Sequence, residues 1–87
     1  MGPPMDTETL SIFVDAYKSG NLTTAANHFY LTQSTVSKRI AALEREIGTR
    51  LLERGKGMPQ ATPTPAGVAF YEIAERILTL HTQALRL

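Results

Sequence analysis

The chain has 87 residues, 43% of them hydrophobic and 20% charged, which allows one small domain with a single core and excludes a disordered chain. It holds no cysteine, so disulfide scaffolds and thiolate metal sites are excluded, and a reducing cytoplasm is the expected setting. The net charge is only +1, but residues 32–56 are basic and residues 1–31 acidic, which is typical of either a solvated charged face or a nucleic-acid surface.

Two helices are predicted in the first third of the chain, after a start (residues 1–5) that is expected to be disordered or artificially added. Asp6 is suited to cap the first helix and Gly20 to end it. Asn21 is suited to cap a second, short helix over residues 22–30. Apolar residues recur at helical spacing and predict one inner face, formed by Leu10, Phe13, Val14, Tyr17, Ala25, Ala26 and Phe29.

A third helix is predicted from Thr32, an N-cap candidate, to Gly48, which ends it. The spacing places four residues on its apolar face: Val36, Ile40, Leu43 and Ile47. The outward face then holds Ser34, Lys38, Ala41 and Arg45, flanked by Thr35 and Ser37. Two short helices joined by residues 30–32, with small residues where they cross, are typical of a helix-turn-helix. On this pattern alone, a plain helical hairpin without a ligand is an equal alternative.

A β-hairpin and a long helix complete the predicted fold. Residues 51–54 and 60–62 are expected to form two short strands around a glycine-rich loop. Pro63 has no N–H for a strand ladder, so the second strand is predicted to end there. The Thr64-Pro65 pair is typical of a helix start, and helical spacing continues to the end of the chain. The expected fold is mainly α with a small β-hairpin: a winged helix-turn-helix followed by a long C-terminal linker helix.

Five segments carry a resemblance to a known family. In chain order they are Leu10-x-x-Phe13-Val14, residues 20–26 (GNLTTAA), residues 31–40 (LTQSTVSKRI), Leu43-Glu44-x-x-Ile47-Gly48-x-x-Leu51-Leu52-x-Arg54, and Thr64-Pro65-Ala66-Gly67. Together they cover nearly all of residues 6–80, and their ordered combination is highly specific. The chain resembles the DNA-binding domain of LysR-type bacterial transcriptional regulators. It departs from the family pattern at Pro63, where leucine or threonine is usual, and at Gly57, where a basic residue is often found.

The resemblance implies both a domain organisation and a function. Residues 6–64 are expected to form the winged helix-turn-helix DNA-binding domain, and residues 65–87 a linker and dimerisation helix. The implied protein is a sequence-specific regulator that binds dyad-symmetric promoter sites in double-stranded DNA, as a homodimer, in the bacterial cytoplasm. A recognition helix (about 32–47) and a wing (about 55–60) are expected to contact the DNA. Tetramers and a small-molecule effector are expected only through a further domain outside this chain, and no cofactor or metal is expected.

The first half of the third helix holds the strongest candidates for DNA contact. In a helix-turn-helix this part of the second helix enters the major groove. There the Gln33 amide is suited to an adenine edge and the Lys38 ammonium to guanine acceptors. Ser34, Thr35 and Ser37 share the same side of the helix, and hydroxyls at a helix start are suited to phosphate oxygens.

For five further residues a DNA contact competes with a structural role. Thr23 and Thr24 either bind phosphate or cap the second helix. Arg39 and Arg54 either bind phosphate or pair with a carboxylate, which for Arg54 is expected to be one such as Glu44. Lys56 at the wing tip either lies over a minor groove or beside a phosphate, or it is a solvated lysine.

The last helix is predicted to dimerise, because its distal half lies beyond the reach of a three-helix body. The apolar stripe expected at the interface consists of Ile73, Ile77, Leu80, Ala84 and Leu87.

No constellation of residues predicts catalysis, because the carboxylates are scattered and no glycine loop follows a strand. His28 and His81 stand alone and receive no role. Two other classes are alternatives to a DNA-binding regulator: a helical protein-interaction module that works through its last helix, and a winged helix that binds RNA or has a structural role in a larger complex. Salt-dependent binding to duplex DNA distinguishes the first alternative, and competition with structured RNA distinguishes the second.

Overall fold

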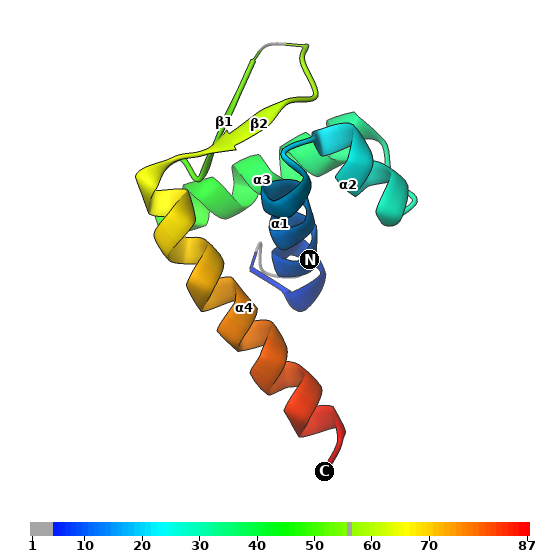
Figure 1. Cartoon of the computed structure of the whole chain (residues 1–87), viewed down its shortest axis with the longest axis vertical. Coiled ribbons are helices and arrows are strands. Elements are labelled where there is room, and N and C mark those ends of the chain that lie inside the picture. The colour runs from blue at the N-terminus through cyan, green and yellow to red at the C-terminus, as the bar shows by residue number, and fades with distance from the viewer. Residues whose placement is uncertain (1–4, 56) are drawn as a thin grey trace.

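Capping side chains begin each helix of the computed structural model, which describes residues 5–55 and 57–87. The helices are α1 (Thr7–Ser19), α2 (Leu22–His28), α3 (Gln33–Ile47) and α4 (Pro65–Leu85) (Figure 1). Each cap side chain accepts a hydrogen bond from the backbone N–H three residues later; the caps are Asp6, Asn21, Thr32 and Thr64. A cap is worth about 1 kcal/mol, because it satisfies a donor that the helix itself leaves unpaired. These four predicted caps are confirmed.

Residues with a left-handed backbone conformation end α1 and α3 and form the turn between α2 and α3. Gly20, with φ 67°, ends α1, and Gly48, with φ 94°, ends α3, as the sequence predicts. α2 ends at His28, before the predicted end at residue 30, because the chain turns there and Tyr30 takes a positive φ of 57°. The result is the short connection between α2 and α3 that a helix-turn-helix requires.

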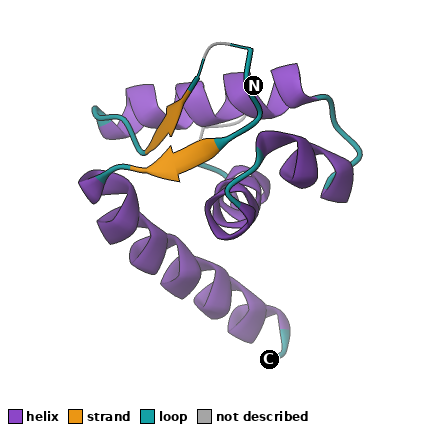
Figure 2. Cartoon of the chain, turned by 45° about the horizontal axis from the view of Figure 1, so that its top comes forward, coloured by secondary structure: helices purple, strands orange, loops and turns teal. Residues whose placement is uncertain are grey.

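The core forms around α1, which contacts α2, α3, α4 and the hairpin (Figure 2). Ile12 is fully buried although it lies outside the predicted stripe, because α1 is covered from several sides. Each such side chain contributes about 1.5–3 kcal/mol by leaving water. The largest fully buried side chains are Leu10, Ile12, Phe13, Leu22, Val36, Ile40, Leu43, Leu51 and Leu52.

The hairpin consists of β1 (Leu52–Arg54) and β2 (Ala61–Pro63), which pair antiparallel with Leu52 opposite Pro63. The second strand ends at Pro63, as predicted, and both strands lie within one residue of the predicted ranges. The hairpin is fixed to the start of α2 by backbone bonds: the Leu22 N–H donates to the Pro59 carbonyl at 2.7 Å, and the Ala61 N–H donates to the Gly20 carbonyl at 3.0 Å. These bonds hold the hairpin beside the helix-turn-helix as a wing.

The first half of α4 is fastened to the body by close backbone packing and aromatic contacts. A side chain at Gly67 is excluded, because a Cβ there would lie 1.9 Å from the Leu51 carbonyl oxygen. Phe70 meets Phe13 edge to face, with ring centroids 5.4 Å apart. The Tyr71 ring stacks on Tyr17 of α1 at 4.0 Å, with only 12° between the ring planes. The direction in which α4 leaves the body is therefore set by α1.

The second half of α4 projects away from the body toward the C-terminus (Figure 1). Ile73 is 49% exposed and Leu80 63% exposed, and Ala84 and Leu87 are also exposed. Ile77, also in the predicted stripe, is half-buried and packs partly against the core, because the body reaches further along α4 than the sequence indicates. Within residues 5–55 and 57–87, no helix combines the length and the apolar character that crossing a membrane requires.

Candidate nucleic-acid interface

The first half of α3 presents a polar face opposite its buried side. Val36 and Ile40 are fully buried against the core, whereas Ser34 and Lys38 are exposed. The 3.6-residue period places these exposed residues on one side of the helix, as predicted. The structure thus brings the five α3 candidates together on adjacent turns: Gln33, Ser34, Thr35, Ser37 and Lys38.

Gln33 is held between α2 and the wing by both ends of its side-chain amide. The Thr23 hydroxyl donates to Gln33 Oε1 at 3.1 Å. Gln33 Nε2 donates to the Met58 backbone carbonyl, in the wing loop, at 3.5 Å. The sequence indicates a polar residue at this position, but it does not reveal either partner, because they lie 10 and 25 residues away along the chain.

The two threonines at the start of α2 have different roles. The Thr24 N–H donates to the Asn21 side chain at 3.0 Å, so Asn21 is the cap of α2 and the alternative of capping by either threonine is not observed. Thr23 uses its hydroxyl proton on Gln33. Because this proton is used within the protein, Thr23 in this conformation has no hydroxyl proton to donate to a phosphate.

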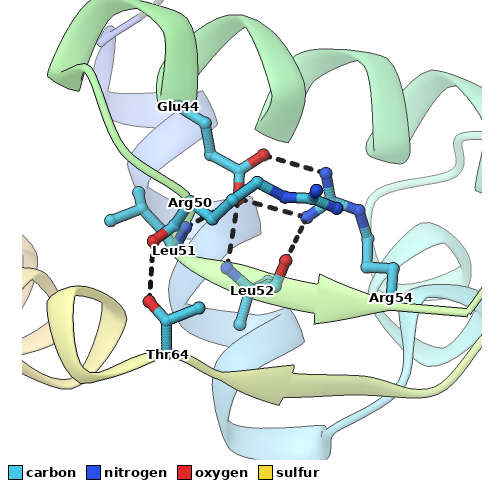
Figure 3. Close-up of polar contacts among 6 residues, drawn as sticks. All are labelled: Glu44, Arg50, Leu51, Leu52, Arg54 and Thr64. Atoms are coloured by element: carbon cyan, nitrogen blue, oxygen red, sulfur yellow. Dashed lines mark hydrogen bonds and ion pairs between the residues drawn. The ribbon is translucent and has the colours of Figure 1, made fainter.

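A buried carboxylate joins the end of α3 to the wing (Figure 3). Glu44 Oε2 accepts from the backbone N–H groups of Leu51 at 2.7 Å and Leu52 at 3.1 Å. Glu44 Oε1 accepts from Arg54 Nη2 at 2.9 Å, and Arg54 Nη1 also donates to the Leu52 carbonyl at 2.9 Å. The side chains of Arg54 and Glu44 are only 11% and 7% exposed. The strand β1 is therefore bonded directly to α3.

The charge of Glu44 is stabilised by these donors. Burial by itself raises the pKa of Glu44, but the hydrogen bonds from Arg54, Leu51 and Leu52 outweigh it and hold the pKa below its ordinary value. The carboxylate stays ionised at neutral pH, as the ion pair requires.

For both arginines with two predicted roles, the structure shows an ion pair. Arg54 donates to Glu44, which leaves the predicted DNA contact by Arg54 without support. Arg39 lies 2.8 Å from Glu8 and also donates to Thr9 Oγ1 at 2.9 Å, so it joins α3 to α1. Lys56, the remaining wing candidate, lies outside the described residues.

Two arginines that the sequence interpretation left without a role lie near the end of α3. Arg45 and Arg50 are exposed and line one shallow hollow with Ala41 and Gly48. Neither takes part in an ion pair within residues 5–55 and 57–87. Arg45 follows Lys38 by seven residues, two helical turns along the same face, and that spacing is the signal that identifies it as an additional cationic candidate.

A helix-turn-helix with an exposed second helix and a hairpin fixed beside it defines a winged helix-turn-helix domain, an architecture that reads duplex DNA in other proteins. The chain belongs to the lysR family of bacterial regulatory helix-turn-helix proteins, whose family model matches residues 7–68. This finding confirms the family and the fold class that the sequence predicts.

Curated relatives of the chain are named as transcriptional regulators rather than enzymes. The chain is 42% identical over 77 residues to the probable HTH-type transcriptional regulator LrrA of Synechococcus elongatus, covering 88% of this chain and 26% of LrrA. It is 41% identical over 76 residues to the HTH-type transcriptional regulator TfdS of Cupriavidus pinatubonensis, covering 87% of this chain and 25% of TfdS. The chain therefore spans about a quarter of the length of these relatives.

Solved structures with the same fold include DNA complexes. A CbnR DBD–DNA complex matches with a TM-score of 0.84 and 34% identity, over 92% of this chain and 90% of that chain. A complex of the BenM DBD with benA site 1 DNA matches with a TM-score of 0.84 and 33% identity, over 94% of this chain and 90% of that chain. Full-length CbnR complexed with its target DNA matches with a TM-score of 0.83 over 27% of its length.

Proposed function

We propose that this chain binds dyad-symmetric promoter sites in duplex DNA as a homodimer and regulates transcription in the bacterial cytoplasm. The observation that carries the proposal is the exposed polar face on the first half of α3, beside a wing that is fixed to it. The likeness to the CbnR and BenM complexes with DNA supports it. In this proposal, effector sensing and assembly beyond a dimer belong to a further domain outside these 87 residues.

In the proposed complex the start of α3 enters the major groove. Gln33 and Lys38 contact base edges, and a bidentate amide contact selects adenine. The hydroxyls of Ser34, Thr35 and Ser37 and the start of α2 at Thr23 and Thr24 lie toward the sugar-phosphate backbone. Lys56 and the exposed arginines at the end of α3, Arg45 and Arg50, add sequence-independent attraction to phosphates.

The proposed dimer forms through the exposed stripe of α4. At 3.6 residues per turn, Ile73, Leu80 and Ala84 lie within an arc of about 40°, with Leu87 beside them. Ile77 stands at the border between this stripe and the core. A twofold axis through α4 makes the interface self-complementary and places two recognition helices for two half-sites.

Replacing Gln33 or Lys38 by alanine is expected to weaken specific binding by about 1–3 kcal/mol each, because each substitution removes a contact to a base edge. The preference at one or two base pairs is expected to relax. The measurement is the affinity for duplexes selected from a random pool by the parent chain. Thr82→Ala and Lys18→Ala, at exposed positions away from α3 and from the apolar stripe of α4, are the controls.

Three outcomes contradict the assignment of α3 as the recognition helix, and the last two concern the parent chain. One is a parent-like preference in both the Gln33→Ala and Lys38→Ala variants. The others are a parent chain that binds no duplex DNA, which favours the protein-interaction module, and one that prefers structured RNA to duplex DNA in competition.

Replacing Lys56 by alanine is expected to lower affinity almost equally for all sequences and to reduce the slope of log affinity against log salt by about one unit. The reason is that a phosphate contact neutralises charge without reading bases. Lys18→Ala removes the same charge from the end of α1 and is the control. An unchanged slope for Lys56→Ala would show that Lys56 makes no phosphate contact.

A further inference from the structure

The side-chain amide of Gln33 is oriented by partners on two other elements. The Met58 carbonyl accepts hydrogen bonds but has none to donate, so the amide nitrogen of Gln33 must face it, at 3.5 Å. The amide oxygen then faces Thr23, whose hydroxyl donates to it at 3.1 Å. The Met58 carbonyl selects one of the two orientations of the amide, and the Thr23 hydroxyl, which can pair with either end of an amide, restrains the amide in that orientation.

These two bonds use half of the hydrogen-bonding capacity of the amide. A glutamine amide has two N–H donors and two oxygen lone pairs. The Met58 carbonyl occupies one donor and the Thr23 hydroxyl occupies one lone pair. One donor and one acceptor are left, which is the pair that a bidentate contact to adenine needs.

We propose that Thr23 is a positioning residue for base recognition, whose hydroxyl restrains the Gln33 amide in the orientation that the Met58 carbonyl selects and that reads adenine. This inference rests on the proposed function of α3. A reversed amide presents its nitrogen to the adenine amino group and its oxygen to the adenine N7, so both contacts are lost. Without the Thr23 bond the amide keeps only the contact with Met58, so it leaves this orientation more readily and discriminates less between base pairs. It also pays the entropy of being ordered when it binds.

The test is the substitution Thr23→Val, which keeps the shape of the side chain and removes the hydroxyl. Thr23→Ser keeps the hydroxyl and is the matched rescue variant. The probes are a duplex selected from a random pool by the parent chain and three duplexes that differ from it only at the base pair whose preference Gln33→Ala abolishes. The readout is the ratio of affinities among these four duplexes, with a thermal unfolding midpoint for each variant.

Thr23→Val is expected to reduce this ratio about three- to tenfold. The reason is that the Gln33 side chain, no longer held by the hydroxyl, must be ordered each time it reads the base. Thr23→Ser is expected to keep the parent ratio. In the Gln33→Ala background, Thr23→Val is expected to change nothing further, because a merely structural effect would persist there and an effect through Gln33 would not. The unfolding midpoint is expected to stay at the parent value, since Thr23 is exposed.

The results separate failure of this inference from failure of the proposed function. A parent-like ratio in Thr23→Val, together with a clear loss in Gln33→Ala, overturns the positioning role alone. An equal effect of Thr23→Val with and without Gln33 also overturns it. A parent chain without any base preference that depends on Gln33 overturns the reading role of α3, and the positioning role with it.

Discussion

Replacing both Ile73 and Leu80 by glutamate is expected to convert a dimer into a monomer and to reduce affinity for a two-half-site duplex about 10²- to 10⁴-fold. Burying one leucine or isoleucine yields about 1.5–3 kcal/mol, and the twofold axis doubles each contribution. Glutamates at these positions replace apolar burial with like charges facing each other across the axis. The loss of DNA affinity follows because each domain then binds its half-site without the effective concentration that the partner supplies.

The matched control places the same two charges on another face of the same helix. Thr79 and Thr82 are exposed and lie about 80° or more from the stripe, so Thr79→Glu with Thr82→Glu is expected to leave the dimer intact. Sedimentation measures the oligomeric state, and far-UV circular dichroism shows that each variant is folded. A parent chain that stays monomeric at high concentration contradicts dimerisation through α4.

Replacing Glu44 by alanine is expected to lower the free energy of unfolding by about 3–5 kcal/mol, a large part of the stability of a small domain. The substitution leaves the Arg54 guanidinium buried without its counter-charge and removes the acceptor of the Leu51 and Leu52 N–H groups. Urea denaturation measures the change. Glu46→Ala, at an exposed position on the same helix, is the control and is expected to change stability by no more than about 0.5 kcal/mol. Equal effects of the two substitutions would show that the buried ion pair contributes no more to the free energy of unfolding than an exposed glutamate does.

The lowered pKa of Glu44 makes the stability of the chain depend on pH, with stability lost as the pH falls. Because its pKa is lower in the folded than in the unfolded chain, the contribution of Glu44 is fully present above its ordinary value of 4.5 and is lost as the pH falls through the lower folded value. Asp6, whose pKa is lowered mainly by the hydrogen bonds from Thr9, acts in the same direction. The parent chain is therefore expected to lose stability in acid more steeply than Glu44→Ala, which lacks the first of these two groups.

The helices of this fold could be predicted from the sequence because their boundaries are set by residues that act on their immediate neighbours in the chain. Asp6, Asn21 and Thr32 are capping residues that act on a backbone N–H three residues away, and glycine at positions 20 and 48 takes the left-handed turn that follows. Each of these signals lies within a few residues of the structure that it produces. The end of α2 was the exception, because Tyr30 takes a positive φ that a non-glycine residue rarely adopts.

The partners of individual side chains could not be predicted in the same way, because they depend on which elements meet in space. The sequence leaves Arg54 with two roles, and the structure shows the ion pair with Glu44, ten residues away and on another element. The sequence predicts that Thr23 binds phosphate or caps α2, and it does not reveal that the fold places the Thr23 hydroxyl beside Gln33. Ile77 is assigned to the outer stripe by its spacing, but the body also covers part of that turn.

The stack of Tyr17 on Tyr71 has a consequence for the spacing of the two half-sites. About 21 Å of α4 lies between Tyr71 and Leu85, so a tilt of about 10° at the tyrosine pair displaces the far end of the helix by about 4 Å. In the proposed dimer, the contacts at Leu80, Ala84 and Leu87 lie toward that far end, and they translate the tilt of each helix into the separation of the two domains. The tyrosine stack fixes the near end of each α4 helix. In the proposed dimer it therefore limits the range of distances between two major-groove segments that one dimer can bind at the same time.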